Sequence, residues 1–162
     1  MWGFQLGDCR RMDILILAHF TTMPKENGNN RFNYLADLLA CNMEHNEVEI
    51  VTSSFSHTSK KQRDNSDNDY GNVKYKIHTC YEPGYPKNVC VKRFYSHYVF
   101  GKNLRKYLES RKIPDVIYCA VPSLDAAYVA MRYAKREKIK FIIDIQDLWP
   151  EAFQMVFNVP LL

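Results

Sequence analysis

The chain has 162 residues, a length typical of one domain, and a chain of this length can bury most of the surface that it exposes when unfolded. Hydrophobic residues make up 46% and aromatic residues 14% of it, which predicts a folded globular domain and excludes intrinsic disorder. The net charge of +4 is uneven, because residues 87–112 hold eight Lys and Arg against Glu109 alone. This basic segment either favours an anionic partner or forms an ordinary solvated helix face.

Neither a targeting segment nor a metal site is indicated. The longest early apolar run, Ile14–Ala18, is too short for a membrane span or a signal peptide. The five cysteines are odd in number and form no CxxC pair, which is typical of reduced thiols in a cytoplasm. We expect residues 1–11 to be a non-structural leader and residues 12–162 to be the domain, with Met1 and Met12 both open as the natural start.

The first half of the chain predicts a βαβ unit followed by a loop and a third strand. Residues 13–18 form an apolar strand, and a helix follows with apolar residues at helical spacing from Phe32 to Met43. Residues 47–52 alternate as a second strand. The polar stretch 53–72 is expected to be a mobile loop, and residues 73–81 a third strand.

The second half continues the alternation of helices and strands. In the helix from Val91, apolar residues switch faces near Gly101, so this helix is either buried on two sides or broken there. Residues 115–120 and 140–145 form two more strands. Between them, Ser123 can cap a helix whose apolar side is predicted to be Leu124, Ala127, Tyr128, Met131 and Ala134. The order predicts an α/β, Rossmann-like parallel sheet with helices on both faces.

Candidate binding residues lie in loops that follow three of the strands, because ligands of such sheets bind beyond the carboxyl ends of the strands. The first loop ends in Asn27, Gly28, Asn29, Asn30 and Arg31, which suit a polyhydroxylated or phosphorylated ligand but also suit a simple turn and helix cap. Ser123 lies in the second loop. In the third, Asp147 and Glu151 could bind sugar hydroxyls beside Trp149, or Asp147 could merely cap a helix.

Other catalytic arrangements are not indicated. His19 and His97 have no acid or nucleophile nearby in the sequence, and no serine or cysteine has the context of a nucleophile elbow. No GxGxxG fingerprint follows the first strand. The sequence therefore predicts no self-contained hydrolase and no dinucleotide site.

Four segments in this order, ILILAHF, the Gly/Asn loop, EVEIVTS and above all DIQDLWPEAF, resemble the N-terminal domain of family-four glycosyltransferases. Within that family the chain is similar, over residues 12–157, to the subgroup that builds bacterial capsule and O-antigen polysaccharides. The resemblance implies one half of a GT-B fold and, for the full-length protein, a retaining glycosyltransferase of hexosyltransferase type. Such an enzyme moves a sugar from a nucleotide diphosphate donor to a lipid-linked or saccharide acceptor.

The resemblance also implies which parts are present. The donor nucleotide site belongs to a C-terminal domain that does not occur within these residues, so the chain alone is expected to be inactive and to hold no cofactor. Gly28, Asn29, Arg31 and Asp147 match positions that face the cleft. The family's usual double glycine is replaced here by residues 27–30, and many members have a histidine where this chain has Gln146 and Asp147. Asp147 is left as the single candidate for a catalytic residue.

Two other classes share the expected architecture: half of a sugar-nucleotide epimerase, and a free-standing Rossmann-like binding module. In the basic segment, Lys102, Arg105 and Lys106 lie on one face at helical spacing and are expected to contact an anionic membrane or a lipid-linked pyrophosphate, not nucleic acid. The expected location is the cytoplasm, peripheral on the inner face of the cell membrane.

Overall fold

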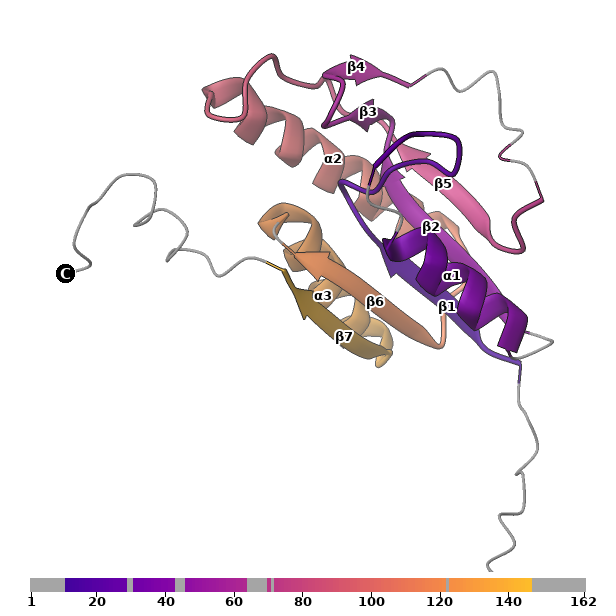
Figure 1. The fold of residues 1–162 in the computed structure, drawn as a ribbon. Helices are drawn as coiled ribbons and strands as arrows, with labels where there is room; N and C mark the ends of the chain where they lie inside the picture. The colour runs from indigo at the N-terminus through magenta and orange to yellow at the C-terminus, as the bar shows by residue number, and fades with distance from the viewer. Residues whose placement is uncertain are drawn as a thin grey trace, which may run out of the picture.

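Five parallel strands form the central sheet of the computed structural model, which describes residues 11–28, 31–42, 46–63, 70, 72–121 and 123–146. The strands lie in the order β5-β2-β1-β6-β7 (Figure 1). Their bounds are β1 Asp13–Leu17, β2 Glu47–Ser53, β5 Lys76–Cys80, β6 Val116–Val121 and β7 Lys140–Ile145. The predicted parallel sheet is confirmed, and the expected leader falls almost entirely on residues outside these ranges.

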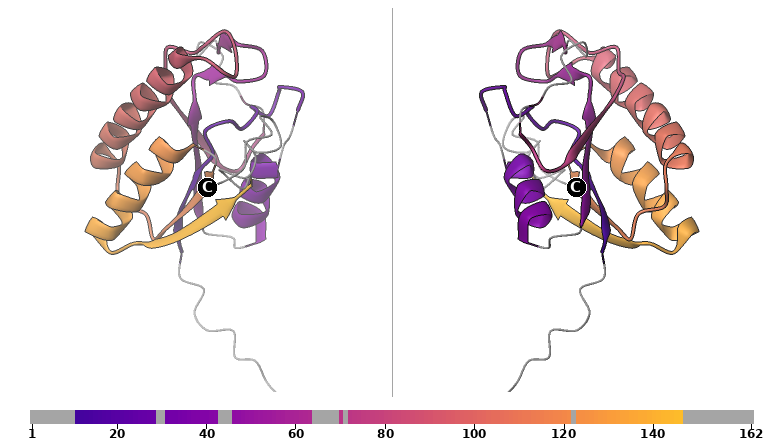
Figure 2. Two further views of the ribbon diagram at one scale, coloured as in Figure 1. Left: turned by 90° about the vertical axis from the view of Figure 1, so that its left-hand side faces the viewer. Right: turned by 90° about the vertical axis from the view of Figure 1, so that its right-hand side faces the viewer.

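Helices cover both faces of this sheet. Helix α1 (Arg31–Asn42) lies on one face, and α2 (Val91–Ser110) and α3 (Leu124–Glu137) lie on the other (Figure 2). Side chains alternate along each strand, so Ile14 and Ile16 of β1 pack in the α1 core while Leu15 and Leu17 pack against α2 and α3. This arrangement is the predicted Rossmann-like α/β fold.

The stretch predicted to be a mobile loop is partly regular. Strands β3 (Phe55–Ser56) and β4 (Lys61–Gln62) pair as an antiparallel hairpin. Phe55 is buried, and the Cβ of a larger residue at Gly84, where φ is 78°, would lie 2.4 Å from its ring. The loop prediction is therefore wrong for residues 53–63, and residues 64–69 and 71 lie outside the described ranges.

Helix α2 neither breaks at Gly101 nor is buried on two sides. It runs unbroken for 20 residues, with Ser96, Phe100, Gly101, Leu104 and Leu108 as its buried residues. Gly101 faces α3, since an added Cβ would lie 3.5 Å from the Cβ of Asp125. Phe94, Tyr95 and Tyr98 point outward, whereas the sequence pattern was equally compatible with a second buried face.

The buried side of α3 differs from the prediction. Ala126, Ala130, Tyr133 and Ala134 are buried, whereas Leu124, Tyr128 and Met131 are 63%, 55% and 46% exposed. Small alanines let the helix lie close to the sheet, so the larger apolar residues are turned outward. Of the predicted apolar side, Ala134 is buried and Ala127 is partly buried.

Strand β7 forms one edge of the sheet and is exposed on both faces. Ile142, Ile143 and Ile145 are 50%, 52% and 60% exposed. In the register with β6, Ile142 lies beside Tyr118 on the α1 face and Ile143 beside Cys119 on the opposite face. The described helices therefore leave apolar surface of this strand uncovered on both sides.

A cluster of charged side chains lies at the amino-terminal ends of β1 and β2. Arg111, just after α2, donates to Asp13 at 2.8 Å and to Glu49 at 3.1 Å. All three side chains are largely buried, with exposed fractions between 6% and 13%. Charges out of water are tolerated only when they are paired, so this arginine fixes the end of α2 to β1 and β2.

We predict that Arg111→Met destabilises the domain by about 3 kcal/mol, because the substitution leaves two buried carboxylates without their cation. The matched control is Arg105→Met, which removes an exposed arginine paired with Glu109 and should cost about 1 kcal/mol or less. Urea unfolding of both variants measures the difference. Equal losses in the two variants would show that the buried cluster contributes no more than a surface ion pair.

Candidate functional site

The candidate site lies at the carboxyl ends of β1 and β6, where the order of the sheet reverses. From β1 the chain crosses to β2 over the α1 face, and from β6 it crosses to β7 over the α3 face. The two loops therefore diverge to opposite faces and leave a crevice between them, which is where open α/β sheets bind ligands.

A pocket of about 70 Å³ occupies this crevice. The loop after β1, the start of α1 and the ends of β6 and β7 form its walls, with lining residues Ala18, His19, Phe20, Thr21, Phe32, Ala120, Ser123 and Gln146. Binding sites for small molecules usually enclose about 300–1,000 Å³. This pocket therefore fits one group of a ligand, such as a hydroxyl, and not a whole sugar.

Behind the pocket, the side chain of His19 is hydrogen-bonded to two residues from distant parts of the chain. Its Nδ1 lies 2.7 Å from Oγ of Ser123, and its Nε2 lies 2.8 Å from Oε1 of Glu82. Glu82 also accepts hydrogen bonds of 2.5 Å from the hydroxyls of Ser53 and Ser96. The Glu82 network comprises these five residues, and all of them are at most 2% exposed.

The hydrogen bonds of the Glu82 network define the charge and the tautomer inside it. Burial raises the pKa of Glu82, but hydrogen bonds from His19, Ser53 and Ser96 and the charge of His19 outweigh burial and lower it to about 2. A carboxylate can only accept, so Nε2 of His19 carries a proton. In the neutral ring, Nδ1 then accepts a hydrogen bond from the Ser123 hydroxyl.

Aromatic rings hold the imidazole of His19 in one orientation. It stacks between Phe100, with centroids 3.8 Å apart, and Phe20, 4.3 Å apart, while His97 meets it edge-on at 5.0 Å. The pKa of His97 is lowered to about 4, mainly by burial and secondly by nearby positive charge. His97 is therefore uncharged at neutral pH.

Arg63 fastens the loop that carries His19. Its guanidinium donates to the backbone oxygens of Thr21 at 2.7 Å and Ser53 at 2.5 Å, and it pairs with Glu26 at 2.9 Å. Its side chain is 8% exposed. The first loop is therefore tied to the end of β2, and the site is built on a fixed frame.

Among the predicted site residues, Ser123 is placed at the pocket. It precedes α3, yet its hydroxyl makes no capping bond and contacts His19 instead. Arg31, at the start of α1, pairs with Asp144 of β7 at 2.8 Å across the same edge. Asn27 and Gly28 are exposed and do not line the pocket.

Gly28 has a structural role in its loop. Its φ is 151°, and an added Cβ would lie 2.6 Å from Cγ2 of Thr22. The remaining predicted site residues, Asn29, Asn30, Asp147, Trp149 and Glu151, lie outside the described residues.

Sequence reasoning missed the two central residues, His19 and Glu82. His19 had no partner nearby in the sequence, because Glu82 and Ser123 are 63 and 104 positions away. Their positions in the sequence were the one available signal. His19 follows the first predicted strand and Glu82 follows the third, and because the carboxyl ends of parallel strands lie at one edge of a sheet, the two side chains could have been expected near each other.

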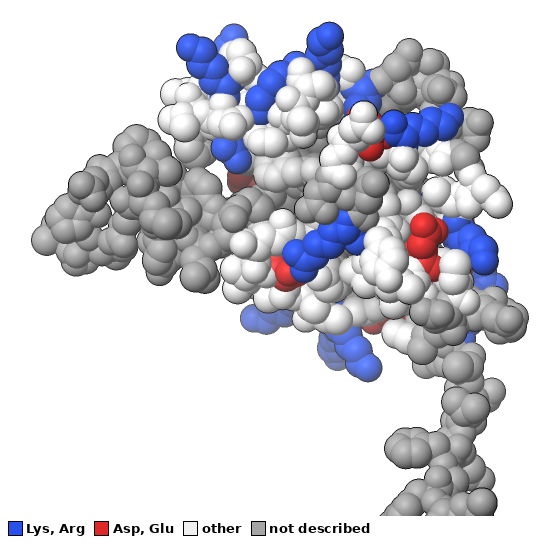
Figure 3. All heavy atoms as spheres, viewed as in Figure 1, with Lys and Arg blue, Asp and Glu red and all other residues white. Residues whose placement is uncertain are grey.

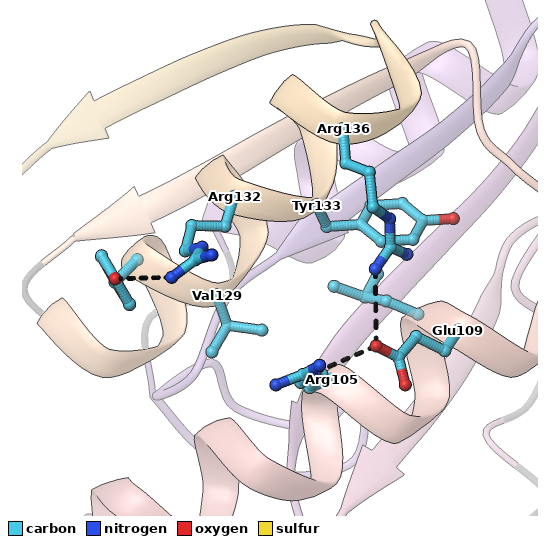
Figure 4. A pocket seen from close by; sticks show the side chains of 8 residues that line it. Arg105, Glu109, Val129, Arg132, Tyr133 and Arg136 are labelled. Atoms are coloured by element: carbon cyan, nitrogen blue, oxygen red, sulfur yellow. Dashed lines mark hydrogen bonds and ion pairs between the residues drawn. The ribbon is translucent and has the colours of Figure 1, made fainter.

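A larger pocket, of about 320 Å³, lies between α2 and α3 (Figure 4). In this pocket Arg105 lies 2.9 Å and Arg136 3.6 Å from the carboxylate of Glu109. We favour the smaller crevice as the site, because it lies at the reversal of the strand order and borders a buried polar network. Within the described ranges, no group of three or more His, Cys, Asp or Glu side chains is placed to hold a metal ion.

Chemically, the crevice offers hydrogen-bonding side chains to one polar group of a ligand. Ser123 and His19 line the pocket, and Glu82 holds the imidazole through Nε2. The three residues have the connectivity of a serine, histidine and acid triad. However, Ser123 is 1% exposed, so an ester carbonyl could reach its oxygen only after rearrangement. The described geometry therefore does not favour attack by Ser123.

Comparison with known proteins adds evidence on the fold alone. No family model and no curated protein matches the chain. The C-terminal domain of a hydrogenase from Pyrococcus furiosus is similar with a TM-score of 0.52 and 12% identity, over 82% of this chain and 91% of that one. A UGT transferase from Siraitia grosvenorii, solved with UDP, has a TM-score of 0.49 and 11% identity, over 82% of this chain and 28% of that one, and is too distant to bear on function.

We predict that the domain loses stability as the pH falls from about 4.5 towards 2, where Glu82 becomes protonated. The folded pKa lies below the ordinary value, so the stabilisation is complete above that value and is lost as pH falls through the folded pKa. Glu82→Gln should lower the free energy of unfolding at neutral pH and flatten its dependence on pH in this window.

The matched control is Glu137→Gln at the end of α3, which should keep the parent's pH dependence. Urea unfolding at a series of pH values measures both variants. A Glu82→Gln variant as stable as the parent at pH 7, with the same acid slope, would contradict the role assigned to this carboxylate.

Proposed function

We propose that this chain is the acceptor-binding domain of a glycosyltransferase that transfers a sugar from a nucleotide diphosphate sugar to a lipid-linked or saccharide acceptor. One observation carries the proposal furthest. The crevice between β1 and β6 is lined by Ser123, His19 and Gln146. Because both ring nitrogens of His19 are engaged by Ser123 and Glu82, hydrogen bonds to a ligand fall to the oxygen of Ser123 and the exposed amide of Gln146. Such groups bind sugar hydroxyls by hydrogen bonds.

Two further features support the proposal. The fold is the Rossmann-like type that the resemblance to family-four glycosyltransferases implies for the acceptor side. In addition, Arg31 lies at the same edge with its side chain 50% exposed, where a pyrophosphate or another anionic group of an acceptor could approach it. The capsule and O-antigen role, and an acceptor contact by Asp147, Trp149 or Glu151, remain proposals from the resemblance.

The small volume of the crevice fits this function. A pocket of about 70 Å³ admits a hydroxyl of an acceptor sugar and leaves the rest of the sugar at the surface. In a GT-B enzyme a second domain closes over this edge and contributes the nucleotide site. The described residues form the acceptor side of such a cleft.

We predict that the chain binds a soluble, short-chain analogue of a lipid pyrophosphate sugar more tightly than it binds nucleotide sugars. Titration followed by amide NMR should shift the signals of residues 18–21 and Ser123. Ser123→Ala should weaken binding of the analogue about fivefold or more, because one hydrogen bond contributes about 1 kcal/mol.

The matched control is Ser110→Ala, at the far end of α2, where the hydroxyl contacts only the backbone oxygen of Tyr107 among described residues. This variant should bind the analogue as the parent does. Binding of a nucleotide sugar at the crevice, without binding of the acceptor analogue, would favour the epimerase reading and reject the acceptor role.

We also predict that the chain by itself transfers no sugar, because the donor site of a GT-B enzyme lies on its other domain. The chain would be incubated with a panel of nucleotide sugars and lipid-linked acceptors, and product would be followed by mass spectrometry. Turnover near 1 per second, within the ordinary range for enzymes, would show that the described domain carries a complete active site.

A further inference from the structure

The outward face of α2 carries a continuous row of exposed apolar side chains over its first two turns. Val91, Phe94, Tyr95 and Tyr98 are 84%, 73%, 62% and 61% exposed. Their spacing of three and four residues places them on one side of the helix, opposite the buried Phe100. Val89, just before the helix, is 77% exposed. We call Val89, Val91, Phe94, Tyr95 and Tyr98 the aromatic stripe.

The stripe is not part of either core of the domain. The sheet-facing side of α2 is already filled by Phe100, Leu104 and Leu108, none of which is more than 1% exposed. A row of large apolar side chains that the domain's own packing does not use marks an interaction surface.

The same outward face becomes basic in the next two turns. Lys102, Arg105 and Lys106 follow the stripe at helical spacing and are exposed. Arg105 is held by Glu109 at 2.9 Å, so the two lysines are the better candidates for contact with an anionic partner. Figure 3 shows Lys and Arg side chains projecting over the region of α2 and the β3–β4 hairpin.

We propose that this face of α2 docks on the surface of an anionic lipid bilayer. The aromatic stripe enters the headgroup region, and Lys102 and Lys106 lie against lipid phosphates. Aromatic side chains beside lysines are the composition of helices that lie in a membrane interface. The proposed attachment is peripheral, through one face of a surface helix. No helix within the described ranges is long and apolar enough to cross a bilayer.

Charge favours a bilayer over a second copy of the chain as the occupant. Glu109 is the single acidic residue of α2, and Arg105 already pairs with it. Two copies placed face to face along α2 would bring their basic halves together in a parallel arrangement, and in an antiparallel arrangement would lay the lysines of each copy against the apolar stripe of the other without an acidic partner. An anionic lipid surface neutralises the same residues, and each contributes about a fivefold gain in binding.

The helix that carries the docking face also contributes to the network behind the candidate site. Ser96, on the inner side of the stripe's own helix, donates to Glu82 and accepts the amide of Gly84 at 2.8 Å. Arg93, on the side of α2 opposite the stripe, lies over the ring of Phe20 at 5.8 Å. Docking would therefore fix, at the bilayer surface, the helix that supports the site, which suits a lipid-linked acceptor if the proposed function holds, although membrane binding does not depend on that function.

The test is sedimentation of the chain with phosphatidylcholine vesicles, with and without phosphatidylglycerol, at low and high salt. We expect binding to the anionic vesicles. Replacing Phe94, Tyr95 and Tyr98 together by Ser should weaken it about tenfold or more at either salt concentration, because the apolar contact is lost. The double variant Lys102→Glu and Lys106→Glu should lose binding mainly at low salt, where charges are least screened.

The matched control replaces the exposed apolar row of α3, Leu124, Tyr128 and Met131, by Ser, and it should bind as the parent does. Since the triple variant of α2 could fail to fold, Phe94→Trp provides a gentler probe. Its added indole fluorescence should shift to the blue and be quenched by brominated lipids. Acceptor binding, measured separately without vesicles, distinguishes failure of this inference from failure of the proposed function.

Three results would overturn the inference. The first is a parent chain that does not sediment with anionic vesicles. The second is an equal loss in the α2 and α3 Ser variants. The third is a parent that forms dimers in solution, which the α2 variant abolishes, without binding to vesicles; the stripe would then be a contact between copies of the chain.

Discussion

The buried carboxylate of Glu82 is hydrogen-bonded to three separate parts of the chain. It follows β5, and it accepts hydrogen bonds from the loop after β1, from the end of β2 and from α2, through His19, Ser53 and Ser96. A charge without solvent is stable only when donors surround it, so folding must bring all three donors to one point. The register of β1, β2 and β5 and the placement of α2 therefore depend on each other through one side chain.

Much of the sheet could be predicted from the sequence, because each strand is a short apolar or alternating run between polar segments. The partners of His19 could not be predicted in this way, because the hydrophobic periodicity indicates which face of an element a residue occupies but not which distant residue it contacts. The exposed side of α3 was predicted wrongly for a related reason. Large Leu124, Tyr128 and Met131 suggested the core, yet close packing on the sheet favours Ala126 and Ala130. Size matters as well as hydrophobicity when a helix lies close to a sheet.

Helix α2 uses its two sides for different purposes. Inward, it fills the core and supplies Ser96 to the Glu82 network; outward, it presents aromatic and then basic side chains. The switch at Gly101 that appeared ambiguous in the sequence is the point at which α2 meets α3, and the helix passes it unbroken. Both the crevice and the outward face thus depend on the position of a single helix, so a displacement of α2 would affect the two surfaces together.

Strand β7 has a consequence for how the domain behaves at high concentration. Its backbone hydrogen bonds are made on the β6 side, and three isoleucines of this edge strand are at least half exposed. An extended edge with apolar side chains on both faces is a template for pairing with another chain, and Lys140 and Asp144 are the charges on this strand that oppose it. Natural sheets protect such edges with charge, proline or a covering segment. Among the described residues no segment pairs with this edge, so strand addition by another chain is the self-association that it favours, and Ile142→Lys would oppose it at little cost to the core.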